Sequence, residues 1–178
     1  VWIWRAGPAN KQGRIAADNV CGGSRRYHGS QGSSVLKLFG LTAAFTGINE
    51  KTARAAGIAY DKVVLFPASH AAYYPGAQSM VMKVLYEKES LRLLGAQIVG
   101  GDGVDKRIDV LATAIRAKMT ALELTELDLS YAPPYSSAKD PVNMAGFMIE
   151  DLESGKVRQF HWNDVEDLPC DGSATLLD

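Results

Sequence analysis

Two apolar segments joined by a short charged turn constrain the fold of this chain more than any other feature of its sequence. Residues 80–86 (MVMKVLY) and 93–99 (LLGAQIV) each have the length of a β-strand, and residues 87–90 (EKES) between them are charged or polar. Apolar strand-sized segments separated by so short a turn pair as a β-hairpin. We therefore expect a sheet that is mainly antiparallel.

The segment after this hairpin has the periodicity of an amphipathic helix. Its charged residues, such as Asp105 and Asp109, fall largely on another face, and Asp102 is placed to cap the first turn. A helix of this kind packs its apolar face on the sheet. The apolar residues at helical spacing are Val104, Ile108, Leu111, Ala112, Ile115 and Met119.

The segments before the hairpin extend the sheet. Residues 35–48 are rich in Val, Leu, Phe and Thr and predict one long strand, with a bend or bulge at Gly40. Residues 49–56 predict a compact helix that is capped by Asn49. Residues 62–66 predict a further strand.

The remaining segments complete one domain. Residues 120–127 predict a short helical segment, residues 131–140 (YAPPYSSAKD) predict a loop broken by prolines, and a last helix begins with Pro141 and ends near Gly155. Together these elements predict an α+β fold of about 120 residues, with a mainly antiparallel sheet and helices packed on it.

The first thirty residues predict a separate unit. Residues 12–20 have the spacing of a short amphipathic helix, and Pro8 lies where a helix begins. Residues 24–34 (SRRYHGSQGSS) are polar and rich in glycine, which is typical of a linker. We expect a domain boundary near residue 30. Because the chain opens on Val1 and closes on an apolar, strand-like run, we also expect a piece of a longer protein.

Composition excludes several classes of function. The net charge is −1 and no stripe of lysine and arginine is present, so we expect no nucleic-acid partner. The longest apolar stretches are interrupted by lysines and fall far short of the ~20 residues of a membrane span. Cys21 and Cys170 form no CxxC pair, and no leader-like segment precedes them. We expect a soluble, cytoplasmic protein.

Other motifs that could indicate chemistry favour structural roles. Residues 100–103 (GGDG) lack the spacing of a phosphate-binding loop and predict a turn from strand to helix. Ser136 and Lys139 match the SxxK pattern of serine acyl-enzymes, but the prolines around them predict a loop. The three histidines are too scattered to be metal ligands, so we expect no metal site.

Two loops place tyrosines beside prolines. Residues 73–76 (YYPG) and residues 131–135 (YAPPY) carry aromatic hydroxyl groups on rigid loops, where core packing does not require a tyrosine. The alternative is that these are interface tyrosines whose hydroxyl groups are satisfied by hydrogen bonds. The residues alone leave both interpretations open.

Four motifs, taken in their order along the chain, carry a resemblance to a known family. Over residues 5–155 the chain resembles the coenzyme A disulfide reductases and their NADH oxidase and persulfide reductase relatives, a branch of the flavin-dependent pyridine nucleotide-disulfide oxidoreductases. The motifs are AGPANKQGRIAAD from Ala6, SHAAYYPGA from Ser69, GDGVDKRIDVLATAI from Gly101 and LSYAPPYSSAKDPVNMAG from Leu129.

The resemblance implies a division into three parts. Residues 1–30 correspond to the end of an FAD domain, residues 31–155 to a dimerisation domain, and residues 156–178 resemble the truncated start of a fused rhodanese-like domain. The family's subunit also contains an NAD(P)H domain and a redox cysteine, both outside this chain. We therefore expect the fragment alone to be inactive and to bind neither FAD nor NAD(P)H. The catalytic loop of a rhodanese would lie downstream, so Cys170 is not assigned as a nucleophile.

The resemblance also implies roles for residues of the dimerisation domain. In related homodimers, the tyrosines that match Tyr73 and Tyr131 approach the redox cysteine of the other subunit, and the lysine that matches Lys139 approaches coenzyme A. We expect the three side chains to converge on one exposed rim, with their polar atoms unsatisfied by local partners. A phenol can donate a proton to a leaving thiolate, which a phenylalanine cannot.

For the first unit, the resemblance places Ala9 and Asn10 at a helix start that faces the flavin, where free amides and the positive end of the helix dipole would interact with it. Lys11 would meet acidic groups of coenzyme A. Two alternatives stay open for the whole chain: an NADH oxidase or peroxidase of the same family, and a dimerisation module without an enzymatic role.

Overall fold

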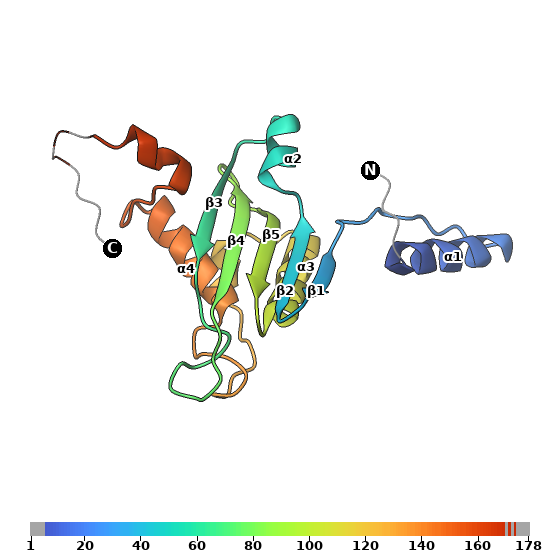
Figure 1. The fold of residues 1–178 in the computed structure, drawn as a ribbon. Helices are drawn as coiled ribbons and strands as arrows, with labels where there is room; N and C mark the ends of the chain where they lie inside the picture. Colours follow the sequence, from blue (N-terminus) through green and yellow to red (C-terminus); the bar gives the residue numbers. More distant parts are fainter. Residues whose placement is uncertain (1–5, 170, 172, 174–178) are drawn as a thin grey trace.

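The computed structural model describes residues 6–169, 171 and 173 of the 178-residue chain (Figure 1). The strands are β1 (Ser34–Leu38), β2 (Leu41–Gly47), β3 (Tyr60–Leu65), β4 (Met80–Glu87) and β5 (Leu93–Gly100). The α-helices are α1 (Ala6–Val20), α2 (Glu50–Ala55), α3 (Val104–Ala117) and α4 (Pro141–Glu153). Two short 3₁₀-helices follow α3 and α4, namely η1 (Leu122–Leu124) and η2 (Trp162–Asp167).

The five strands form one antiparallel sheet in the order β1-β2-β5-β4-β3. Strands β4 and β5 form the predicted hairpin, from Met80 opposite Gly100 to Tyr86 opposite Leu93. The α+β fold with a mainly antiparallel sheet is therefore confirmed.

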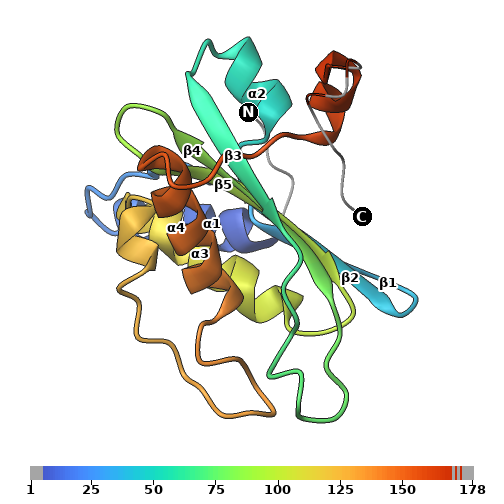
Figure 2. The ribbon, with the colours of Figure 1, turned by 90° about the vertical axis from the view of Figure 1, so that its left-hand side faces the viewer.

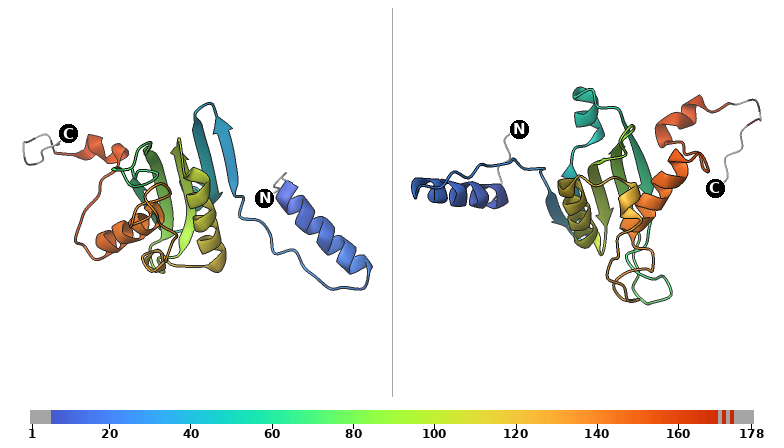
Figure 3. Two further views of the ribbon diagram at one scale, coloured as in Figure 1. Left: turned by 90° about the horizontal axis from the view of Figure 1, so that it is seen from below. Right: turned by 180° about the vertical axis from the view of Figure 1, so that it is seen from behind.

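Helices α3 and α4 cover one face of this sheet, as Figures 2 and 3 show. Alternate side chains of β4, namely Met80, Met82 and Val84, are buried on this face because successive residues of a strand point to opposite sides. On α3, the predicted apolar stripe is buried at Val104, Ile108 and Leu111. Each fully buried side chain of this size contributes about 1.5–3 kcal/mol.

The opposite face of the sheet is largely open. Helix α2 lies at one end of it, next to the start of β3 (Figure 1). Strand register places Leu36, Ala43, Val99 and Val81 in one row across four strands of this outer face. Leu36, Val81 and Val99 are exposed in that row, and Phe45 is exposed beside it.

One long strand was predicted for residues 35–48, and this prediction is wrong. The segment folds into two strands, β1 and β2, that pair antiparallel around a turn at Phe39 and Gly40. Phe39 has a φ of 52°, in the left-handed region that favours glycine. The turn was missed because apolar residues lie on both sides of Gly40. A single strand with a bend at this glycine would show the same sequence pattern.

Helix α1 begins six residues earlier than the predicted start at Gln12. Pro8 lies within its first turn, where the missing amide of a proline gives up no helical hydrogen bond. None of its side chains is buried, and α1 stands apart from the sheet in Figures 1 and 3. Residues 23–33 lead from α1 to β1 without regular structure, and Gln31 Nε2 donates a hydrogen bond to the Ala112 carbonyl at 2.7 Å.

Candidate functional site

The two tyrosine loops meet at one end of the sheet. One connects β3 to β4 and the other connects η1 to α4, and both project below the sheet in Figure 1. The hydroxyl groups of Tyr73 and Tyr131 lie 3.0 Å apart and share a hydrogen bond, although 58 residues separate them in the chain. Their side chains are 76% and 48% exposed, so the pair is open to an incoming group. The predicted convergence of the two tyrosines is confirmed.

The hydrogen bond between the two hydroxyl groups also corrects one expectation. The sequence led us to expect hydroxyl groups without local partners, whereas each is the partner of the other. This hydrogen bond is the largest influence on Tyr131 and raises its pKa above the ordinary value of 10.0. A tyrosine with a pKa at or above about 10 is neutral at pH 7, and the neutral phenol is the form that can donate a proton.

Lys139 lies near the same loops but in a different environment. Its side chain is exposed, and its Nζ atom is 5.9 Å from the centroid of the Phe147 ring on α4. Among the described residues, no hydrogen bond joins Lys139 to Tyr73 or Tyr131. The convergence is confirmed for the two tyrosines, and the place of Lys139 on the same rim stays a prediction.

A backbone hydrogen bond joins the two loops behind their tyrosines. The Ala71 amide donates to the Ser136 carbonyl at 3.0 Å. His70 is buried next to it, with Nδ1 3.1 Å from the Ala71 carbonyl and its ring edge against Tyr74 at a centroid distance of 5.8 Å.

A buried arginine links both loops to α3. The Arg107 guanidinium donates to the Ser69 carbonyl at 2.7 Å and to the Ser136 hydroxyl at 3.2 Å, and its Nε and Nη2 atoms lie 3.2 and 3.0 Å from Asp140 Oδ2. It also donates to the Gly103 carbonyl at 3.1 Å, one turn earlier on the chain. We call these five residues the Arg107 cluster.

Asp140 closes the Arg107 cluster at the start of α4. Its side chain caps α4 by accepting from the Val142 amide at 3.0 Å, and it accepts from the Ser136 hydroxyl at 2.7 Å. Burial by itself would raise the pKa of Asp140, but the hydrogen bonds from Ser136 and Val142 and the charge of Arg107 lower it overall. Asp140 is therefore an ionised carboxylate, paired with a cation in the interior.

The start of α3 differs from the prediction. Asp102 was expected to cap the helix, but the cap residue is Gly103, with a φ of 69° and no side-chain cap. A Cβ atom at Gly103 would lie 2.0 Å from Arg107 Nη1, so glycine is needed there for the guanidinium to reach its partners.

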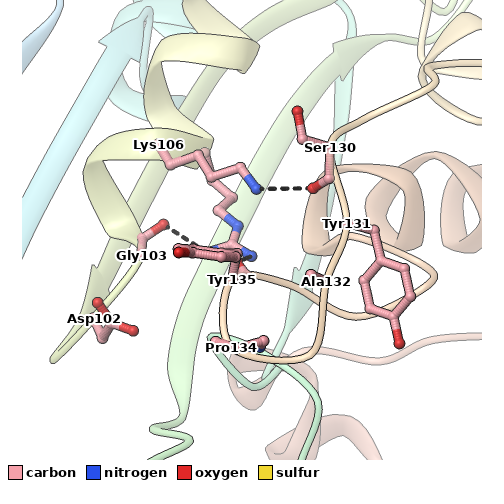
Figure 4. A pocket seen from close by; sticks show the side chains of 9 residues that line it. Asp102, Gly103, Lys106, Ser130, Tyr131, Ala132, Pro134 and Tyr135 are labelled. Atoms are coloured by element: carbon pink, nitrogen blue, oxygen red, sulfur yellow. Dashed lines mark hydrogen bonds between the residues drawn. The ribbon is translucent and has the colours of Figure 1, made fainter.

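A cavity of about 430 Å³ lies between the start of α3 and the second tyrosine loop (Figure 4). Lys106 points from α3 toward the Ser130 carbonyl, to which it donates at 3.4 Å. The residues that line the cavity are Asp102, Gly103, Lys106, Arg107, Ser130, Tyr131, Ala132, Pro134 and Tyr135. Tyr131 therefore belongs both to the tyrosine pair and to the wall of this cavity.

Sequence reasoning missed Arg107 altogether. The residue occupies a position on the apolar stripe of α3, between Val104 and Leu111. A cation at such a position must find an ionic or hydrogen-bonding partner, and this is the signal that could have drawn attention to it. Its partner Asp140 is 33 residues away, so the sequence alone could not name it.

The candidate residues of α1 lie away from the tyrosine loops (Figure 1). Because the helix begins at Ala6, the amide of Ala9 is the last of the four that lack a helical partner, and that of Asn10 lies beyond them. The two residues thus follow the first residue of the helix by three and four positions. Lys11 is exposed on the following turn.

The other motifs of the sequence have structural roles. Ser136 lies in a loop and donates to Asp140, and residues 100–103 connect β5 to α3 as predicted. Among residues 6–169, 171 and 173, no cluster of three or more His, Cys, Asp or Glu side chains is placed to hold a metal ion. Within the same range, no helix has the length and hydropathy needed to span a bilayer. Cys170 lies outside the described residues.

The fold and the loop geometry correspond to a known domain family. The family described as "Pyridine nucleotide-disulphide oxidoreductase, dimerisation domain" matches residues 34–141, which include the whole sheet, α3 and both tyrosine loops. The chain belongs to this family.

Individual relatives narrow the comparison. The chain is 39% identical over 145 residues to the coenzyme A disulfide reductase of Staphylococcus haemolyticus, covering 81% of this chain and 32% of that protein. The crystal structure of reduced Bacillus anthracis CoADR-RHD has 48% identity and a TM-score of 0.90, over 94% of this chain and 30% of that one. A NAD-dependent persulfide reductase from A. fulgidus has 44% identity and a TM-score of 0.82, over 84% and 28%. The chain thus spans about a third of the length of such curated relatives.

Proposed function

We propose that this chain is the dimerisation part of a flavin-dependent NAD(P)H:disulfide oxidoreductase of the coenzyme A disulfide or persulfide reductase type. In this role, Tyr73 and Tyr131 serve the active site of the partner subunit. The observation that carries the proposal is the exposed, hydrogen-bonded tyrosine pair at the tips of two loops. The names of the relatives at 39–48% identity supply the class of substrate.

Reduction of a disulfide explains the need for such a pair. Breaking one S–S bond consumes two electrons and leaves two thiolates, of which the departing one takes up a proton. A neutral phenol within hydrogen-bonding distance of the departing sulfur can donate that proton or a hydrogen bond. Tyr131 is neutral at pH 7, and its bond to Tyr73 provides a second hydroxyl along the same path.

Lys139 is proposed to bind the coenzyme A part of the substrate. Its ammonium group is exposed beside the second tyrosine loop, in reach of an anionic phosphate from solvent. The Phe147 ring beneath the lysine offers a weak cation–π contact that favours an extended side chain. Lys11 is proposed to contribute a second positive charge from α1.

FAD and NAD(P)H are the cofactors of the proposed intact enzyme, in which the flavin passes two electrons from NAD(P)H to the redox cysteine. The start of α1 fits a group that bears partial negative charge, because its first turn carries no acidic side chain and the helix dipole is positive there. Ala9 and Asn10, in the second turn, are the residues proposed to lie against the flavin. The methyl side chain of Ala9 leaves room for a flat ring.

A homodimer is proposed because the tyrosine loops need an active site that this chain does not contain. Exposed apolar side chains are available for subunit and domain contacts at the β1–β2 hairpin, where Leu38, Phe39 and Leu41 are all exposed.

The end of the chain, residues 156–178, is proposed to begin a rhodanese-like domain. From this segment, Gln159 donates a hydrogen bond to the Lys62 carbonyl on the edge strand β3.

The test is to join the chain to the FAD and NAD(P)H domains of a coenzyme A disulfide reductase and to measure NAD(P)H oxidation with four acceptors. Turnover with coenzyme A disulfide or a persulfide, above that with oxygen or peroxide, is the expected result. Faster turnover with oxygen or peroxide would instead identify an oxidase or peroxidase. A folded, flavin-loaded chimera that oxidises NAD(P)H with none of the four would indicate a module without an enzymatic role.

A further inference from the structure

We infer that Arg107 is a positioning residue for the proposed reaction: it holds the two tyrosine loops at the separation that lets Tyr73 and Tyr131 share a hydrogen bond. No hydrogen bond joins Arg107 to the hydroxyl group of Tyr73 or Tyr131, so it acts through its partners at the base of the loops.

The first argument is where its contacts fall. The Ser69 carbonyl, which accepts from Arg107 at 2.7 Å, lies four residues before Tyr73 on the first loop. The Ser136 hydroxyl and the Asp140 carboxylate lie on the second loop, after Tyr131. A single side chain thus fixes the base of both loops to α3, while the tyrosines connect their tips.

The second argument is that only arginine can make this set of contacts. A guanidinium has five N–H donors in a planar fork, and here they face three carbonyl groups, one hydroxyl and one carboxylate at the same time. Lysine has one nitrogen and a flexible stem, so it can keep the charge beside Asp140 but cannot reach the Ser69 and Gly103 carbonyls together.

The third argument is burial. Arg107 is 1% exposed and Asp140 is 3% exposed, so water cannot replace a lost contact. A buried carbonyl that loses its donor shifts until it finds another, and the loop moves with it. The tips of the loops are highly exposed and have little packing of their own to resist such a shift.

The test compares three variants of the 178-residue chain. Arg107→Lys keeps the positive charge, and Ser136→Ala is a milder variant that removes one hydroxyl and leaves Arg107 and Asp140 paired. Tyr86→Phe is the control, because it removes a partly buried hydrogen bond of 2.7 Å to Glu153 on α4, away from both loops. The measurement is the pKa of Tyr131, followed by NMR of ¹³C-labelled tyrosine.

In the unchanged chain, the hydrogen bond that Tyr131 shares with Tyr73 raises the Tyr131 pKa. The Arg107→Lys variant is expected to lower this pKa toward that of an isolated tyrosine, and Ser136→Ala to lower it by a smaller amount. Tyr86→Phe should leave it raised. If both loop variants show the same Tyr131 titration as the unchanged chain, Arg107 does not position the pair and the inference is overturned.

The catalytic consequence of this inference rests on the proposed function. Measuring turnover in the assembled enzyme distinguishes the positioning role of Arg107 from the catalytic role of the tyrosines. Arg107→Lys is expected to lower the turnover number about tenfold or more and to leave the KM for NAD(P)H within about twofold, because misplaced groups reduce the rate of the chemical step. If the variant separates the tyrosine pair and turnover does not change, the proposed catalytic role of the tyrosines is contradicted, whereas the positioning role of Arg107 is supported. Lower turnover with an intact pair would contradict the positioning.

Discussion

The two ends of the sheet each carry a cluster of charged side chains, and the clusters differ in how deeply they are buried. At the loop end, Arg107 and Asp140 are almost completely buried. At the α2 end, Glu50 is paired with Lys62 and Lys83, and these side chains are 12%, 17% and 26% exposed. Figure 1 places α2 and the tyrosine loops at opposite ends of the strands.

This difference in burial shows which cluster determines the geometry of the loops. The guanidinium of Arg107 makes directional bonds to three chain segments and has no solvent to replace them. Glu50 accepts from Lys62, Lys83, Arg54 and the Tyr60 hydroxyl, and water can reach these partly exposed groups. The first cluster fixes the shape of the end that carries the candidate chemistry, whereas the second fastens a short helix to the sheet.

The largest expected effect is on stability. Replacing Arg107 with Met leaves a buried carboxylate without its main partner, and we expect a loss of about 3 kcal/mol or more in the free energy of unfolding. Replacing Glu50 with Gln breaks partly exposed ion pairs, and we expect a smaller loss of about 1–2 kcal/mol. Urea unfolding of the 178-residue chain, followed by circular dichroism, measures both values.

A chain with Arg107→Met that is already unfolded without urea also agrees with this expectation. Losses of equal size in the two variants would contradict the comparison. Lys106, whose Nζ lies 3.8 Å from Asp140 and is more exposed, provides a further control. Lys106→Gln should cost much less than Arg107→Met if burial decides the outcome.

A smaller effect is expected in the response to acid. Burial alone would raise the pKa of Glu50, but hydrogen bonds and charges from Lys83 and Lys62 lower it from 4.5 to about 2. A carboxyl group with a lower pKa in the folded state stabilises the fold above its unfolded pKa and loses that contribution as pH falls. The contribution of Glu50 is therefore present above pH 4.5 and is lost between pH 4.5 and about 2.

The Glu50→Gln variant isolates this contribution. Urea unfolding at several pH values between 6 and 3 should show that the unchanged chain loses stability more steeply than the variant. Parallel curves would mean that Glu50 is not held by its two lysines. The pKa of Asp140 is also lowered. Its contribution to the pH dependence of stability is the same in both chains, so it cancels when the two curves are compared.

The sequence predicted the elements whose signals are local. The β4–β5 hairpin, the Asn49 cap of α2 and Pro141 at the start of α4 all follow from the chemistry of a few neighbouring residues. The turn at Phe39 was missed because a left-handed φ at a phenylalanine is uncommon and apolar residues lie on both sides.

The candidate site was predictable only in part. The motifs that carry the family resemblance singled out Tyr73 and Tyr131, and the structure brings them together. Arg107 lies within one of these motifs, but its role was not predicted, because it depends on loop partners 29 to 38 residues away in the chain. The same resemblance places Lys139 on the rim with the tyrosines, and this stays a prediction; its Nζ atom lies 5.9 Å from the centroid of the Phe147 ring.

The most direct test of the proposed role of the tyrosine pair is the turnover number of the assembled enzyme with both Tyr73 and Tyr131 replaced by Phe. Disulfide turnover should fall about 10²-fold or more, because phenylalanine can donate no proton to the departing thiolate. The dimer and the rate of flavin reduction by NAD(P)H should not change, since neither depends on the two hydroxyl groups. An unchanged disulfide turnover in the double variant would contradict the account.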